Sequence, residues 1–108
     1  MNDCKVEMDG DFALVRVRGE VDLSWSQSVR KAILEALGKV KNVGVELSGV
    51  SYIDSSGIAA LVEGFQSARG KGQKFALVAA SPQVQAVLKL ARLARVFPMV
   101  DTVAAARA

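Results

Sequence analysis

The stretch Val45-Glu46-Leu47-Ser48-Gly49-Val50-Ser51-Tyr52-Ile53-Asp54-Ser55-Ser56-Gly57-Ile58 decides the fold, because its pattern changes from strand to helix midway. Val43–Leu47 is short and β-rich, and Val50, Tyr52 and Ile53 add a second apolar step. After Gly57 the apolar residues recur with the spacing of one helix face, at Ile58, Leu61, Val62 and Phe65. The segment therefore predicts a buried strand, a loop at 54–57 and then a helix.

Upstream of this stretch the chain predicts a hairpin and a helix. Residues 4–8 and 12–18 alternate between apolar and polar side chains around Asp9-Gly10-Asp11, which has the composition of a turn. Ser24 and Gln27 have the spacing of a capping box, so we expect a helix over Trp25–Leu37. Its apolar stripe is Val29, Ala32, Ile33, Ala36, Leu37 and Val40.

Downstream, two further strands and two further helices are expected. Lys74–Ala80 is a continuous apolar strand of the kind covered on both faces. Ser81 and Pro82 have the chemistry of a helix start. Met99–Val100 predicts an edge strand, and Asp101 or Thr102 is expected to cap a terminal helix over Val103–Arg107.

The alternation of strands and helices predicts an α/β fold. We expect residues 1–108 to form one domain with a mixed, mostly parallel β-sheet, an N-terminal antiparallel hairpin and helices packed against the sheet. A length of 108 residues fits a single core, and the 51% hydrophobic and 23% charged residues are typical of globular chains.

Composition argues against several classes of function. The sequence has no histidine and one cysteine, Cys4, which removes Ser-His-Asp and Cys-His nucleophiles and leaves no zinc-binding cluster. We therefore expect no catalytic residues, no metal and no cofactor. Apolar runs such as Ile58–Val62 and Phe75–Ala80 are too short to cross a bilayer, and the N-terminus lacks the pattern of a secretory signal. With an unpaired Cys4, these features favour the cytoplasm and no membrane insertion.

The net charge of +3 does not indicate nucleic-acid binding. The basic residues are spread over several elements and mixed with acids, and the aromatic residues are scattered singly. We expect no nucleic-acid partner.

Asp54-Ser55-Ser56-Gly57 is the most informative segment for function. It lies where a strand meets a helix, and the free N–H groups and the dipole of a helix start favour an anion such as phosphate. The alternative is structural: Asp54 or Ser55 caps the helix and Gly57 permits a tight turn. Residue chemistry alone favours capping.

Four elements in order resemble one family. Val45–Ile58 closely resembles the signature of the STAS domain, the module shared by sulfate transporters and bacterial anti-sigma factor antagonists. Gly19-Glu20-Val21-Asp22 resembles the family's Gly-Glu-Leu-Asp element, with Val21 in the leucine position. Gly72–Phe75 before a strand and Ser81–Val84 at a helix start also have family equivalents. The resemblance spans nearly the whole chain and implies a small stand-alone STAS domain.

The resemblance implies a protein-binding switch rather than an enzyme. In the antagonist branch, a partner anti-sigma kinase phosphorylates the serine directly after the aspartate, which places that role on Ser55, with Ser56 as second choice. Unphosphorylated antagonist docks on the anti-sigma factor and frees the sigma factor, phosphorylation releases it, and a phosphatase resets the switch. The resemblance also places Asp22 near the serine, to orient it or contact the partner; a turn or cap aspartate is the alternative.

The expected partner-binding residues are those of the loop and one stripe of the following helix. They are Asp22, Asp54, Ser55, Ser56, Gly57, Ala60, Gly64 and Ser67. The last three are small and lie on one helix stripe, which would permit close approach by a partner or by a neighbouring helix of the same chain.

A second binding function stays open at this point. Some small STAS proteins are accessory subunits of lipid-transporting ABC transporters and bind the ATPase subunit. That branch often has threonine where this chain has Ser55, so the serine favours the phosphorylated switch.

Overall fold

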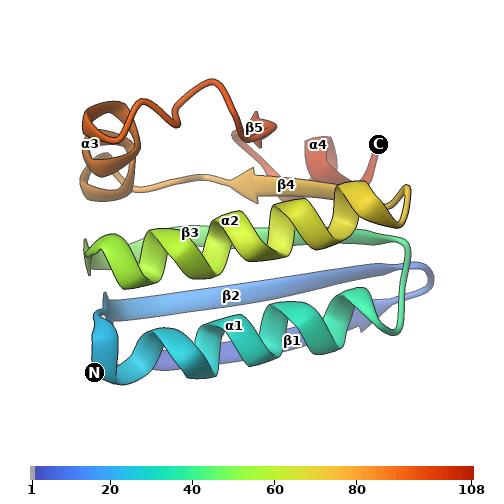
Figure 1. The fold of residues 1–108 in the computed structure, drawn as a ribbon. Coiled ribbons are helices and arrows are strands. Elements are labelled where there is room, and N and C mark those ends of the chain that lie inside the picture. Colours follow the sequence, from blue (N-terminus) through green and yellow to red (C-terminus); the bar gives the residue numbers. More distant parts are fainter. Residues whose placement is uncertain (1) are drawn as a thin grey trace.

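The computed structural model describes residues 2–108; Met1, which the sequence assigns to the domain, lies outside the described residues. Within this range the elements are β1 (Asp3–Asp9), β2 (Phe12–Val21), α1 (Leu23–Leu37), β3 (Asn42–Ile53), α2 (Ser55–Gly70), β4 (Lys74–Val78), α3 (Pro82–Leu90), β5 (Met99–Val100) and α4 (Val103–Arg107). The order confirms the alternation predicted from the sequence (Figure 1).

In residues 2–108 the strands form one five-stranded sheet in the order β1-β2-β3-β4-β5. β1 is antiparallel to β2, and the other neighbouring strands are parallel. Gly10 in the β1–β2 turn has a φ of 61°, which glycine adopts without strain. The mixed, mostly parallel sheet with an N-terminal hairpin is therefore confirmed.

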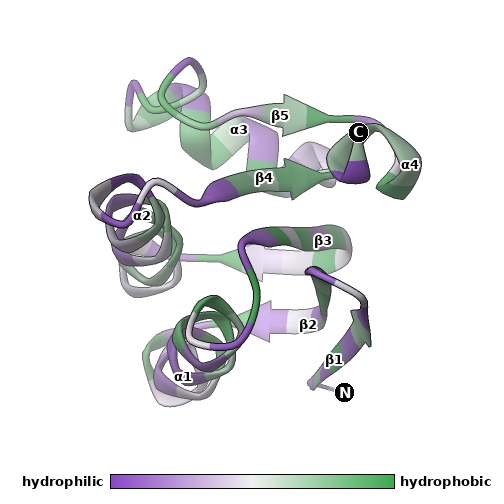
Figure 2. Ribbon diagram, turned by 90° about the vertical axis from the view of Figure 1, so that its right-hand side faces the viewer, coloured by the Kyte–Doolittle hydropathy of each residue, from purple (hydrophilic) through white to green (hydrophobic). Residues whose placement is uncertain are grey.

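Helices cover both faces of the sheet. α1 and α2 lie side by side on one face, and α4 lies on the other (Figures 1 and 2). The main core forms between the sheet and the first two helices, and includes Val15, Val43, Val45, Ile33 and Leu61. A smaller apolar cluster under α4 contains Phe12, Leu14, Val78 and Ala106.

The first helix starts earlier than the Ser24–Gln27 pattern predicts. Its N-cap is Asp22, whose Oδ1 accepts hydrogen bonds from the Trp25 N–H at 3.2 Å and the Ser24 hydroxyl at 2.6 Å. A carboxylate is a stronger acceptor than a serine hydroxyl, and Asp22 directly follows the end of β2. The predicted capping box of Ser24 and Gln27 is therefore wrong. Asp22 caps α1 instead, which is the structural alternative that the sequence left open for this residue.

Two details of the strands also differ from the prediction. β4 ends at Val78 instead of Ala80, because Ala79 has a φ of 51° and leaves the extended conformation. Tyr52 is exposed, although the sequence pattern placed it in a buried strand. The ladder between β3 and β4 ends at Glu46 and Val78, and beyond it Ser81 donates hydrogen bonds to the carbonyls of Leu47 and Val50.

Candidate functional site

The ends of two parallel strands bring Asp22 and Asp54 to the same edge of the sheet. Val21, the last residue of β2, is paired with Ile53, the last residue of β3. Each strand is followed at once by an aspartate that caps a helix. The Asp54 N–H donates a hydrogen bond to the Val21 carbonyl at 3.3 Å, so the two loops are in direct contact.

Asp54, not Ser55, is the N-cap of α2. Its Oδ1 accepts from the N–H groups of Ser56 at 2.9 Å and Gly57 at 3.2 Å, and from the Ser56 hydroxyl at 2.5 Å. The Ser56 hydroxyl is the main reason why the pKa of Asp54 lies below its usual value, and the N–H groups of Gly57, Ser56 and Leu23 act in the same direction against partial desolvation. The helix start is thus occupied by an ionised carboxylate of the chain itself.

This lowered pKa predicts how stability depends on pH. Because the folded chain holds the pKa of Asp54 below 3.8, the ionised carboxylate stabilises the fold above that pH, and this contribution disappears as pH falls through the lowered pKa. Asp54→Asn keeps an oxygen for capping but cannot ionise. We expect its free energy of unfolding to fall below that of wild type at neutral pH and to converge on it in acid, as measured by urea denaturation.

The exposed Asp101, in the bend before α4, provides the control for that measurement. Asp101→Asn removes the same charge without touching a cap of α2. A deficit of Asp54→Asn that is unchanged from neutral pH to acid would show that charge at Asp54 contributes nothing.

The two serines of the loop are in different environments. Ser56 is half-buried and its hydroxyl is bonded to Asp54. Ser55 is the first residue of α2 and is exposed, and its hydroxyl has no hydrogen-bond partner among residues 2–108. Of the two serines, Ser55 is the one that another protein can reach without breaking a bond.

Gly57 is required by the close approach of α2 to β2. A Cβ atom at this position would lie 2.6 Å from Ile53 Cγ1 and 2.7 Å from the Val21 carbonyl oxygen. Both distances are far below van der Waals contact, and one partner is backbone. The glycine therefore holds the helix start against the strand ends rather than presenting a surface.

A small depression of about 130 Å³ lies between the first turns of α1 and α2. Its walls include Ser26, Gln27 and Ala59, with Ser56 at the end nearest the loop. An ion pair between Arg30 and Glu63 crosses from one helix to the other. The sequence analysis did not identify the α1 residues beside this helix start. One of them is Leu23, which is 73% exposed. Its position directly after Asp22 could have pointed to it.

The small-residue stripe of α2 packs against α1. Ala60 and Gly64 are buried, and a Cβ atom on Gly64 would lie 2.6 Å from Ile33 Cγ2 in α1. Ser67 is half-buried on the same helix. These small side chains let α1 and α2 pack closely, and Ala60 also lines the depression between the two helices. A role of Ala60, Gly64 and Ser67 in partner binding stays a prediction.

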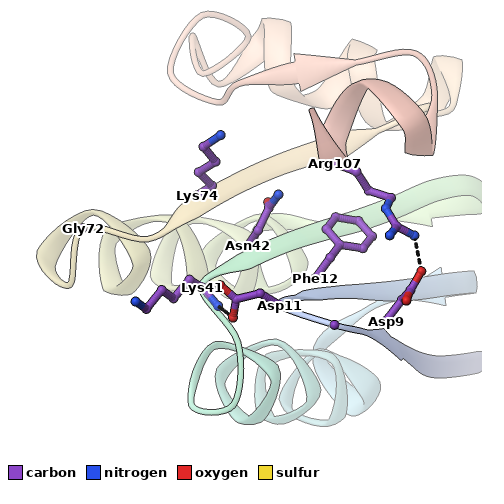
Figure 3. A pocket seen from close by; sticks show the side chains of 9 residues that line it. Asp9, Asp11, Phe12, Lys41, Asn42, Gly72, Lys74 and Arg107 are labelled. Carbon is purple, nitrogen blue, oxygen red and sulfur yellow. Dashed lines mark hydrogen bonds and ion pairs between the residues drawn. The ribbon is translucent and has the colours of Figure 1, made fainter.

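A larger depression of about 500 Å³ lies at the opposite end of the sheet (Figure 3). Its lining includes the turn Asp9-Gly10-Asp11 and Gly72, but none of the residues expected to bind a partner. Arg107 is paired with Asp9 at 2.5 Å and lies over the ring of Phe12, and Asp11 accepts from the Lys41 N–H at 3.1 Å. The loop at the carboxyl ends of β2 and β3 remains the candidate site.

None of the helices in residues 2–108 is long and apolar enough to span a membrane. The range also holds no cluster of three or more side chains of the types that bind metals through histidine, cysteine, aspartate or glutamate.

With the strand order, the paired strand ends and the Asp-Ser-Ser-Gly helix start in place, the comparisons with known proteins agree on the class. The sequence model of the STAS domain matches residues 4–106, and the chain belongs to the STAS domain family. A curated relative, the anti-sigma F factor antagonist of Paenibacillus polymyxa, is 27% identical over 90 residues, which cover 82% of this chain and 77% of the relative.

Solved structures of anti-sigma factor antagonists have the same fold as this chain. An anti-sigma factor antagonist from Mycobacterium paratuberculosis superposes with a TM-score of 0.87 at 25% identity, covering 99% of this chain and 92% of that one. The antagonist SpoIIAA in its unphosphorylated form gives 0.81 at 22% identity, covering 97% and 93%. The phosphorylated form of SpoIIAA from Bacillus gives 0.76 at 22% identity, covering 97% and 96%.

Proposed function

We propose that this chain is an anti-sigma factor antagonist whose docking on an anti-sigma factor is controlled by phosphorylation of Ser55. The docking surface consists of Asp22, Asp54, Ser55 and Ser56, held in place by Gly57. The observation that carries the proposal is the exposed, unbonded Ser55 hydroxyl at the start of α2. In this proposal the chain acts by binding a partner and catalyses no reaction.

Two further facts support the choice of function. The curated relative and the structural neighbours are described as anti-sigma factor antagonists. One of these neighbours, SpoIIAA, has been solved both without and with a phosphate.

Charge explains why modification would alter binding more than folding. A phosphoserine adds about −1.5 to −2 charge at neutral pH. At Ser55 this charge would lie beside the ionised Asp54 and near Asp22, on the rim of the loop and outside the core. Water can solvate it in the free chain, whereas a partner that covers the loop would have to bury it.

The proposal implies two partners. A serine kinase, which is the anti-sigma factor itself in the resemblance, docks on the loop and modifies Ser55; a phosphatase removes the phosphate. Both act in the cytoplasm, as the sequence predicts. In the alternative, an ABC transporter ATPase subunit is the partner and no phosphate is needed.

The test compares two neighbouring serines. Protein purified from its own cells should show one added phosphate by intact mass, removed by phosphatase and mapped by peptide sequencing to Ser55. Ser55→Asp should weaken binding to the anti-sigma factor about tenfold or more, since it places a charge in the interface. Ser55→Ala should bind and stay unphosphorylated, with little loss of stability, because Asp54 and not Ser55 caps the helix.

Ser56→Ala is the matched control and should remain a kinase substrate. A phosphate mapped to Ser56 would show that Ser56, and not Ser55, is the phosphorylated serine. Absence of phosphate under every growth condition, together with co-purification of a transporter ATPase, would overturn the proposal.

A further inference from the structure

β1 is the long open edge of the sheet. It is paired with β2 on one side, and the sheet of residues 2–108 has no strand beyond it (Figure 2). The opposite edge, β5, is only two residues long, whereas β1 has seven. The outer N–H and C=O groups of β1 are thus free to pair with another strand.

The face of β1 that points toward α1 is apolar and incompletely covered. Cys4, Val6 and Met8 are paired with core residues of β2, so their side chains lie on the same face as α1. Val6 is 43% and Met8 48% exposed, although both lie next to the helix. They line a depression of about 190 Å³ between β1 and α1.

We propose that β1 pairs with β1 of a second copy of this chain, antiparallel and centred on Val6, to join two sheets into one. This register pairs all seven residues and keeps the apolar side chains of both copies on the helix face. It places Val6 opposite Val6 and Cys4 opposite Met8.

The length of β1, together with its charges, favours this register over its neighbours. Centred on Val6, each Lys5 faces a Glu7 of the other copy, twice in the dimer. A register centred on Lys5 would set Lys5 opposite Lys5 and Asp3 opposite Glu7, and it would pair five residues instead of seven. A register centred on Glu7 would keep Lys5 opposite Asp9 but would set Glu7 opposite Glu7, and it would also pair only five residues. The pairs at the two ends, Asp3 with Asp9, are alike in charge. Within each copy Asp9 is paired with Arg107 and Glu7 with Arg16.

A cross-linking experiment reads the register directly. Met8→Cys places a new thiol opposite Cys4 of the other copy, within disulfide reach for a directly paired position. Within one strand the same two positions are about 13 Å apart and cannot be bridged. Burial raises the pKa of the Cys4 thiol, and Asp3 adds to this. Oxidation should therefore be run at alkaline pH, where more of the thiol is present as thiolate.

We expect Met8→Cys to form a covalent dimer linked from Cys4 to the new thiol, as mapped by mass spectrometry. Gln66→Cys, on the exposed side of α2, is the control and should not cross-link in this way. Absence of the linkage in the Met8→Cys variant would overturn the register.

A charge exchange tests the same pairing in solution. Wild-type chain should sediment as a dimer that dissociates on dilution. Lys5→Glu sets two Glu–Glu pairs in the interface and should raise the dissociation constant roughly tenfold. The double variant Lys5→Glu/Glu7→Lys restores opposite charges and should recover most of the affinity.

Lys31→Glu makes the same charge change on the exposed side of α1 and should leave dimerisation unchanged. Melting curves of every variant verify that the fold persists, since Glu7→Lys also removes the 2.7 Å ion pair with Arg16. A wild-type chain that remains monomeric from micromolar to millimolar concentration would overturn the proposal. So would a dimer that Lys5→Glu does not weaken.

Discussion

Leu61→Asp should unfold the domain or strongly destabilise it. Leu61 lies on the inner face of α2 and is 1% exposed, in the core between the sheet and the helices. The substitution removes a large apolar side chain and places an unpaired carboxylate where water cannot reach it. A cost of about 3–5 kcal/mol is expected, a large part of the stability of a domain this size.

Thermal and urea melts followed by circular dichroism measure this loss. Gln66→Asp, on the exposed side of the same helix, makes a similar charge change and should melt within a few degrees of wild type. A cooperative Leu61→Asp melt at the wild-type temperature would contradict the packing of α2 against the sheet.

Gly64→Arg should also destabilise the chain strongly, by about 3 kcal/mol or more. The site has no room even for a methyl group, because a Cβ atom would lie 2.6 Å from Ile33 Cγ2 and 3.2 Å from the ring of Phe75. Arginine would have to push α1 and α2 apart and desolvate its charge between them. Gly64→Ala should show a smaller loss in the same direction.

Gly70→Arg is the matched control, since a Cβ atom there meets nothing within 4 Å and the residue is exposed at the end of the same helix. Both variants should be compared by melting temperature before any binding assay. If Gly64→Arg melts like wild type and binds its partner less well, the small-residue stripe is an interface after all.

Periodicity predicted the helices α1, α2 and α3 because each of them buries one face. The spacing of Ile58, Leu61 and Phe65 places α2, and the alternation around Asp9-Gly10-Asp11 places the hairpin. The order of strands and helices was enough to predict a mostly parallel sheet, since parallel neighbours need helical crossovers.

The features that could not be predicted depend on contacts between elements. A stripe of small residues has the same sequence pattern whether it faces a partner or another helix, and only the position of Ile33 decides this for Gly64. Likewise Asp22 and Ser24 are both good caps, and the choice follows from where β2 ends. The open edge of β1 is visible only once the strand order is known.

The pairing of Val21 with Ile53 fixes both helix starts to the end of one rigid sheet. The entropy of ordering the Asp22 and Asp54 loops is therefore lost when the chain folds, not when a partner arrives. The binding surface at this edge is therefore formed before a partner arrives. Association with the partner should proceed without a slow conformational phase.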